Sequence, residues 1–183
     1  SLSGSDEALV NIFSMPGLVF VVTIYTFPYV HIMIANTMAL IASDLESGTA
    51  FRLNGGTAFP TNMGVAATGS ELDAYEMGRI TALEGRAVGI HLNFAPVADV
   101  NNDPANPIIN TRSFGEDPAQ VARLVAAEVR GLQEHGMYAT AKHFPGHGDT
   151  GTDSHIALPV IRADWARLDS VELVPFRRGV DQG

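Results

Sequence analysis

Apolar and polar segments alternate regularly over most of the chain. Short apolar runs at 39–43, 90–100 and 138–144 predict strands, each followed by a polar cluster. The stretches 71–89 and 117–136 repeat apolar residues at helical spacing, and each ends in glycine, a common helix stop. Strands that alternate with helices in this way are typical of a parallel α/β fold.

The last helical pattern covers 162–180, where Pro175 predicts a break between two helices. Asp117 and Pro118 suit the cap and the first turn of the helix at 117–136. In a (β/α)8 barrel, the carboxyl ends of the strands form the active-site face. A doubly wound sheet fits the same alternation, but no G-x-G-x-x-G follows the first strand.

The N-terminal segment is unusually apolar. Residues 8–43 contain no Asp, Glu, Lys or Arg, and 17–35 is long enough to suggest a membrane helix. Pro28 and His31 interrupt this stretch, and no basic flank sets a topology. We therefore favour a buried barrel strand followed by a weak helix, with a membrane segment and an atypical sequence as the alternatives.

Composition narrows the class of protein. Apolar residues make up 46% of the 183 residues and charged residues 17%, which is typical of a globular chain. The formal charge of −9 argues against a nucleic-acid partner, because phosphate binding relies on basic patches. The absence of cysteine excludes disulfides and thiolate metal sites but does not identify the compartment.

Three predicted strand ends carry side chains that could do chemistry, and neighbouring strands would place them over one pocket. The candidates are Asp44, Glu46 and Arg52 after the first run, Asp99, Asn101, Asn102, Asp103 and Arg112 after the second, and Lys142, His143, His147, Asp149, Asp153 and His155 after the third.

Asp153 and His155 form a candidate acid–base pair. A carboxylate two residues from an imidazole can accept a hydrogen bond from one ring nitrogen and leave the other facing a substrate. Such a partner also supports the cationic form of the ring. The alternative is that Asp153 caps a local turn and His155 is solvated, since D-x-H alone is a weak signal.

Three cationic or donor side chains suit a polar ligand. Arg112 could act as a bidentate clamp, or instead order its loop through an ion pair with Glu116 or Asp117. Lys142 and His143 could donate to sugar hydroxyls or to an anion, or the lysine could pair with a carboxylate for structural reasons.

Other polar residues have more structural interpretations. Asp44 could bind substrate hydroxyls or cap a turn, and Glu46 is predicted to be structural. His147, which lies between glycines, is predicted to brace the loop from beneath. A zinc site is a rival interpretation of the histidines and aspartates between 143 and 155, but neither H-x-H-x-D-H nor H-E-x-x-H occurs.

Four motifs carry a resemblance to a known family. They are "ASDLESGTAFRL" (42–53), "NFAPVADV" (93–100), "NTRSFGEDP" (110–118) and "KHFPGHGDTGTDSH" (142–155). In this order and spacing they resemble glycoside hydrolase family 3, in particular its bacterial β-N-acetylglucosaminidases. One difference is that "ESGT" stands at 46–49, where the family commonly has E-G-G-R.

The resemblance implies a (β/α)8 TIM-type barrel domain, of which residues 1–183 would be an incomplete N-terminal part of about four strands with 1–39 as an atypical apolar segment. It also implies a retaining hydrolase whose acid–base is His155, with Asp153 as its partner. Arg112, Lys142 and His143 would bind the N-acetyl sugar. The remaining binding residues would be Asp44 and Arg52.

The implied partner is a small carbohydrate, an oligosaccharide or muropeptide containing N-acetylglucosamine, and no cofactor is expected. Membrane association is not favoured. The family's nucleophile is an aspartate after a later strand, and no acidic residue here has that context, so a fragment without turnover is expected. The alternatives are a non-catalytic sugar-binding half-barrel and a β-N-acetylglucosaminide phosphorylase.

Overall fold

The computed structural model describes residues 40–151, 156, 159–161 and 163–182. Within them, a parallel sheet has the order β1-β2-β3, formed by Ala42–Ser43, Leu92–Asn93 and Tyr138–Ala139. A further bridge between Val97 and Lys142 continues the pairing beyond β2 and β3. The three predicted strands are therefore present and parallel, although each regular strand is shorter than its apolar run. The earlier strand predicted before residue 39 lies outside the described residues.

Two long helices connect these strands. Helix α3 (Glu71–Ala87) begins after Ser70, whose side chain accepts a hydrogen bond from the Asp73 N–H at 3.2 Å. Helix α4 (Pro118–Gln133) follows Asp117, which caps it as predicted, with a 2.9 Å hydrogen bond from Ala119. Side-chain oxygens thus satisfy N–H groups that the first turns leave unpaired.

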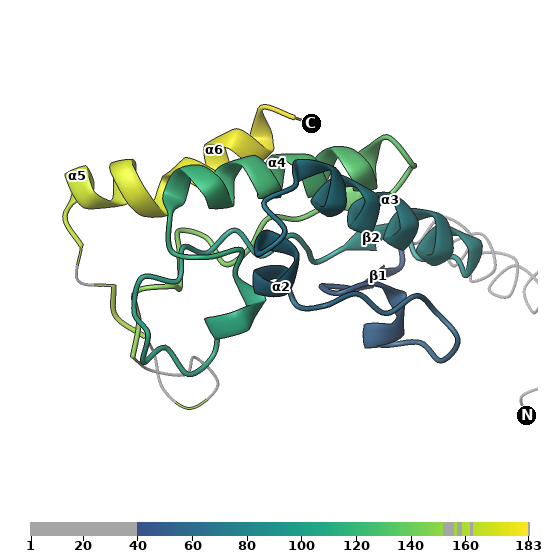
Figure 1. Ribbon diagram of the computed structural model, residues 1–183, viewed down its shortest axis with the longest axis horizontal. Coiled ribbons are helices and arrows are strands. Elements are labelled where there is room, and N and C mark those ends of the chain that lie inside the picture. Colours follow the sequence, from purple (N-terminus) through teal and green to yellow (C-terminus); the bar gives the residue numbers. More distant parts are fainter. Residues whose placement is uncertain (1–39, 152–155, 157–158, 162, 183) are drawn as a thin grey trace, which may run out of the picture. The chain divides into compact units, whose positions relative to one another are not determined.

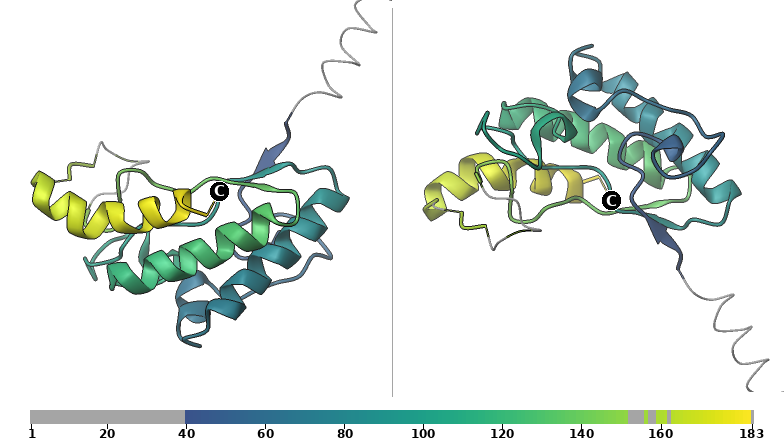
Figure 2. Two further views of the ribbon diagram at one scale, coloured as in Figure 1. Left: turned by 90° about the horizontal axis from the view of Figure 1, so that it is seen from above. Right: turned by 90° about the horizontal axis from the view of Figure 1, so that it is seen from below.

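Helices α3, α4 and α6 (Leu173–Val180) form one layer beside the strands (Figure 1). They lie side by side in the order α3, α4, α6 when the layer is seen from above (Figure 2). Gly131 on α4 is required here, because a Cβ atom at that position would overlap the Tyr75 carbonyl of α3. The backbones of α3 and α4 therefore lie close together at Gly131.

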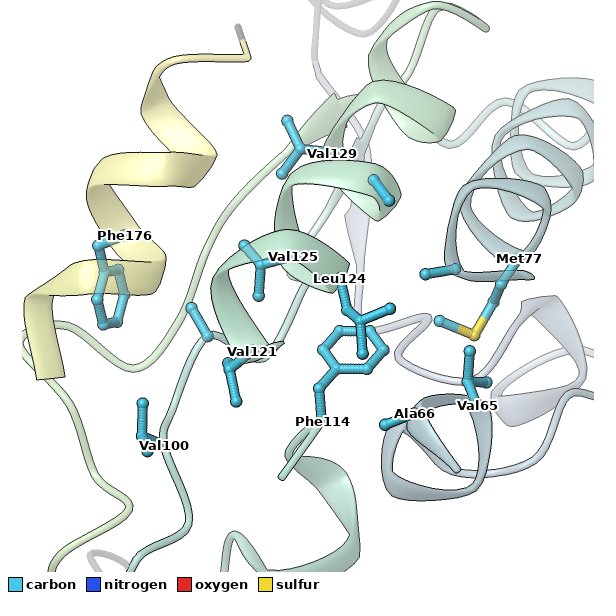
Figure 3. Packing of buried hydrophobic residues seen from close by; sticks show 13 residues of the cluster. Val65, Ala66, Met77, Val100, Phe114, Val121, Leu124, Val125, Val129 and Phe176 are labelled. Carbon is cyan, nitrogen blue, oxygen red and sulfur yellow. The ribbon is translucent and has the colours of Figure 1, made fainter. Parts of the chain in front are cut away.

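The main apolar core lies between the helix layer and the segments beneath it (Figure 3). Val121 and Val125 of α4 are fully buried, as is Phe114 from the segment before that helix. Phe176 of α6 and the short helix α2 (Asn62–Ala66) close opposite sides of this cluster. Burial of these side chains is the main favourable contribution to the fold.

The C-terminal helical segment differs from the prediction at Pro175. The interruption lies before it, where α5 (Trp165–Arg167) passes into a π-helical turn at Leu168–Glu172. Pro175 itself is in the first turn of α6. A first-turn residue needs little from its own N–H, and the wider π turn just before it accommodates the ring, so the proline continues the helix instead of ending it.

The apolar stretch at 17–35 that suggested a membrane segment lies outside the described residues. Among the helices that the structure does describe, none has both the length and the apolarity needed to cross a bilayer.

Candidate active site

A polar cavity of about 380 Å³ opens at the carboxyl ends of the three strands. Parallel strands deliver their following residues to one edge of a sheet, so segments far apart in sequence meet there. The lining residues are Asp44, Glu46, Phe51, Arg52, Ile108, Arg112, Lys142, His143 and His147. All five predicted binding residues, Asp44, Arg52, Arg112, Lys142 and His143, therefore line this cavity.

Glu46 is the centre of the cavity's charge network. One carboxylate oxygen contacts the Arg112 Nη2 atom at 2.8 Å and the Lys142 Nζ atom at 2.7 Å. The other oxygen accepts from the Arg112 Nε atom at 2.9 Å. Burial alone would raise the pKa of Glu46, but the hydrogen bonds and charges of the two cations outweigh burial and lower this pKa to about 2. Glu46 is therefore ionised and holds both cations in place.

Arg112 makes a bidentate pair with a carboxylate of the protein, but that partner is Glu46 and not the predicted alternatives Glu116 or Asp117. Its Nη1 atom also donates to the Ile108 carbonyl at 2.9 Å. The hydrogen bond to Glu46 raises the pKa of the Arg112 guanidinium. A guanidinium fixed from two sides has little freedom, so the position of the Arg112 side chain at the cavity is well defined.

Lys142 and Asp44 form the second charged pair. The Lys142 Nζ atom donates to the Asp44 Oδ1 atom at 2.6 Å, and the lysine side chain is 15% exposed against 41% for the aspartate. Asp44 is thus the more accessible partner. Arg52 lies nearer the rim, with its Nη2 atom 4.0 Å from Asp44 and its guanidinium 4.5 Å from the ring centre of Phe51.

His143 occupies the cavity wall with Asp99 behind it. The His143 Nδ1 atom lies 2.6 Å from the Asp99 Oδ2 atom, and the aspartate is completely buried. On the opposite side of the ring, the Nε2 atom is 3.3 Å from the Arg112 Nη2 atom. The imidazole is therefore held between a carboxylate and a guanidinium.

His147 lies beneath the loop after β3, as predicted. Its side chain is buried and its Nδ1 atom contacts the Thr150 hydroxyl. The Asn106 side chain also donates to the His147 carbonyl at 2.7 Å. The next residue must be glycine, because a Cβ atom on Gly148 would overlap the Val100 carbonyl. The loop is thus pressed against the end of the neighbouring strand.

Asp153 and His155, the predicted acid–base pair, lie outside the described residues. The zinc interpretation depended partly on the same two residues. Among the side chains that are described, no group of three or more His, Cys, Asp or Glu residues is placed to hold a metal ion.

Two residues matter more than the sequence patterns indicated. Glu46 was predicted to be structural, and it does brace the site, but it also determines where both cations lie. Asp99 was grouped with the other strand-end residues without a role. Its position near the end of a buried apolar run was the available signal.

A parallel α/β fold with a charged cavity at the carboxyl ends of its strands is the arrangement of many α/β enzymes and binding proteins. Residues 29–183 match the glycosyl hydrolase family 3 N-terminal domain. The chain belongs to this family, whose N-terminal domain is a TIM-barrel-type α/β fold, and the three-stranded sheet is consistent with part of such a barrel.

Proteins similar to this chain are named as glycosidases and as a phosphorylase. A β-hexosaminidase of Tolumonas auensis is 40% identical over 152 residues, which are 81% of this chain and 45% of that protein. A family 3 β-N-acetylglucosaminidase of Paenibacillus sp. is 51% identical with a TM-score of 0.76, over 79% of this chain and 28% of that one. A β-glucoside phosphorylase is 34% identical with a TM-score of 0.73, over 79% of this chain and 26% of that one. The chain spans less than half the length of each.

Proposed function

We propose that this chain provides the N-terminal part of the active site of a retaining glycoside hydrolase that acts on terminal β-linked N-acetylglucosamine. The family match and the names of the β-hexosaminidase and β-N-acetylglucosaminidase relatives support the substrate class. The natural ligand would be an oligosaccharide or muropeptide carrying this sugar. The domain would be the family's barrel domain over 1–183, with 1–39 as its atypical part.

The observation that carries the proposal is the convergence of five predicted binding side chains on one cavity. Arg112, Lys142 and His143 would hold the N-acetyl sugar, with Asp44 and Arg52 on its outer hydroxyls. Because Glu46 and Asp44 already compensate Arg112 and Lys142, the cavity carries paired charge. Paired charge suits a neutral, multiply hydroxylated ligand better than an anion, whose binding would need unpaired cations.

Asp153 and His155 would supply acid–base catalysis. In the first step, a carboxylate would attack the anomeric carbon while His155 gives its proton to the leaving glycosidic oxygen. In the second, His155 would take a proton from water, which displaces the carboxylate and restores the starting state. Asp153 would support the cationic ring between these steps. We assign no nucleophile among the 183 residues, so residues 1–183 would bind the sugar without turning it over.

The binding half of this proposal is tested by titrating the 183-residue chain with N-acetylglucosamine under NMR observation. Lys142→Ala should weaken binding at least tenfold, because it removes a partly buried donor at the cavity wall. Arg123→Ala is the matched control, since Arg123 is an exposed cation on α4 that pairs with Glu71 away from the cavity. Equal affinity of the two variants would contradict the assignment.

A phosphorylase is the second candidate, favoured by the likeness to a β-glucoside phosphorylase. It differs in the second step, where phosphate replaces water and the product is a sugar 1-phosphate. Product analysis with and without phosphate, in a chain that includes the nucleophile, separates the two. A non-catalytic sugar-binding protein is distinguished there by His155→Ala, which would leave binding intact and abolish turnover only if the protein is an enzyme.

A further inference from the structure

Asp99 is fully buried behind the cavity wall and is surrounded by N–H groups. Its Oδ1 atom is 2.6 Å from the His147 backbone nitrogen. Its Oδ2 atom is 2.6 Å from the His143 Nδ1 atom, and both oxygens lie 3.2 Å from the His143 backbone nitrogen. A carboxylate whose neighbours are all nitrogen donors can act only as an acceptor.

This arrangement decides which nitrogen of His143 carries the proton. Opposite a carboxylate whose other neighbours are N–H donors, the Nδ1 atom must be the donor, so the neutral ring carries its proton there and leaves Nε2 as an acceptor. The surroundings of Nε2 agree independently, because the Arg112 guanidinium, which can only donate, lies 3.3 Å away. A proton on Nε2 would point one donor at another.

The other charged groups near the ring fit the same assignment. Glu46 holds the Arg112 guanidinium through two hydrogen bonds and so keeps its Nη2 atom beside the His143 ring. Lys142 is turned toward Asp44 and Glu46. Among the described residues, Asp99 is the group that can supply a negative charge to Nδ1.

We propose that Asp99 is a positioning residue that holds His143 with Nδ1 protonated and presents Nε2 to the cavity as a hydrogen-bond acceptor. A sugar hydroxyl would then donate to Nε2 in place of Arg112, which lies 3.3 Å away. The assignment of the tautomer stands on the geometry, whereas its consequence for sugar affinity rests on the proposed function. Asp99 itself need not touch the ligand, since it acts through the imidazole.

A long-range ¹H–¹⁵N correlation spectrum of the 183-residue chain tests the tautomer directly, because protonated and unprotonated ring nitrogens resonate far apart. His143→Asn identifies the signal by its loss. In the unaltered chain near neutral pH, Nδ1 is expected to be the protonated nitrogen and Nε2 the bare one. A ring protonated on Nε2 would overturn the inference, and this result requires no folded variant at Asp99.

Asp99→Asn is the decisive variant. The amide oxygen is needed by the His147 N–H, so the amide nitrogen must replace Oδ2 beside the ring. An amide donor there should move the proton of His143 to Nε2, as when the aspartate of a catalytic triad becomes asparagine. Asp103→Asn is the matched control, since Asp103 accepts from the Ala105 N–H in the following loop and should leave the ring signals unchanged.

Sugar titration of the same variants separates this inference from the proposed function. Asp99→Asn should weaken N-acetylglucosamine binding about tenfold or more, because a donor replaces the acceptor at Nε2. Unchanged ring signals in Asp99→Asn would refute the positioning role. If the unaltered chain shows the expected tautomer but binds no sugar, the proposed function fails while the role of Asp99 stands.

Discussion

Two buried glutamates differ in charge at neutral pH: one is ionised and the other is largely neutral. Glu46, at the cavity, has its pKa lowered to about 2 and is ionised. Glu128, on the buried side of α4, has its pKa raised to about 8 and is largely uncharged at neutral pH. The side chains are similarly hidden, with exposures of 5% and 2%, so burial alone does not explain the difference.

The difference lies in the partners of each carboxylate. Glu46 contacts Arg112 and Lys142 directly. Glu128 has an Oε2 atom without a hydrogen-bond partner among the described residues. Burial is the main cause of its raised pKa, and the charge of Glu46 adds to it, while Lys142 opposes it. Of these two carboxylates, the one that stays charged is Glu46, to which two cations have been brought at the candidate site.

The strongest test of this contrast is Glu46→Gln. The substitution leaves the partly exposed Arg112 and Lys142 beside a neutral amide, which is costly because charges withdrawn from water need a counter-charge. The lowering of the Glu46 pKa from 4.5 to about 2 corresponds to about 3 kcal/mol. Urea unfolding near neutral pH should therefore show a loss of about that size.

Glu128→Gln is the matched control for that experiment, because it makes the same change at the other buried glutamate. Its carboxyl is mostly neutral in the folded protein but ionised in the unfolded chain, so an amide of the same shape avoids the cost of holding that proton and should raise stability near neutral pH. Equal losses in the two variants would mean that Glu46 is not held by its cations.

The pH dependence of stability provides the second test. Glu128 has a folded pKa above its unfolded value of 4.5, so the unfolded state releases its proton first as the pH rises. Stability should then fall by ~1.4 kcal/mol per pH unit between about pH 5 and about pH 7. In Glu128→Gln this slope should disappear, as measured by urea unfolding across the range.

Glu46 contributes with the opposite sign. Its folded pKa lies below the unfolded value, so its contribution is full above 4.5 and is lost as the pH falls toward about 2. Acid unfolding of Glu46→Gln should lack this component. If Glu46→Gln keeps the acid component, or Glu128→Gln keeps the slope between about pH 5 and about pH 7, other groups control the titration in that range.

The sequence predicted which charged residues lie at the strand ends, but it did not predict which of them pair with one another. The alternation of apolar runs and helical stretches predicted the parallel arrangement, and it also placed Asp44, Arg112 and Lys142 at strand ends. Local patterns determine such placements. Which carboxylate meets Arg112 is a long-range property, and the nearby Glu116 was the natural candidate. The actual partner, Glu46, is 66 residues away in sequence.

Charge states were the least predictable feature. Glu128 lies three or four residues from Leu124, Val125 and Leu132, so helical spacing places it on the apolar face, but its charge state depends on long-range partners that the sequence does not show. Its position against the core follows from the close approach of α3 and α4. Pro175 also shows that local sequence does not determine every feature. The sequence predicted a helix break at this proline, whereas the interruption is the π turn at Leu168–Glu172 before it.

Glu84 extends the comparison to a partly exposed carboxylate. From α3, it accepts from the Thr57 N–H at 2.9 Å and from the hydroxyls of Thr49 and Thr57, and the Thr49 hydroxyl is the main reason for its lowered pKa. Its donors are neutral and lie in the loop after β1. Glu84→Ala should cost about 1–2 kcal/mol in urea unfolding. Glu76→Ala, on the same helix, should cost less, and the reverse order would contradict a role in holding this loop.

The smallest effect is expected at the exposed rim of the cavity. The Arg52 Nη2 atom lies 4.0 Å from Asp44, with the two side chains 53% and 41% exposed, so water screens the pair. Arg52→Ala should therefore change the unfolding free energy by less than about 1 kcal/mol and sugar affinity only about threefold. Lys142→Ala removes the other cation near Asp44, but that lysine is 15% exposed and also pairs with Glu46, so both losses should be larger. Because the two variants delete a cation beside the same carboxylate, the ratio of their effects measures what burial and the second carboxylate, Glu46, together add to a charge pair. Equal effects would show that the contrast between the two glutamates does not extend to the cations of the site.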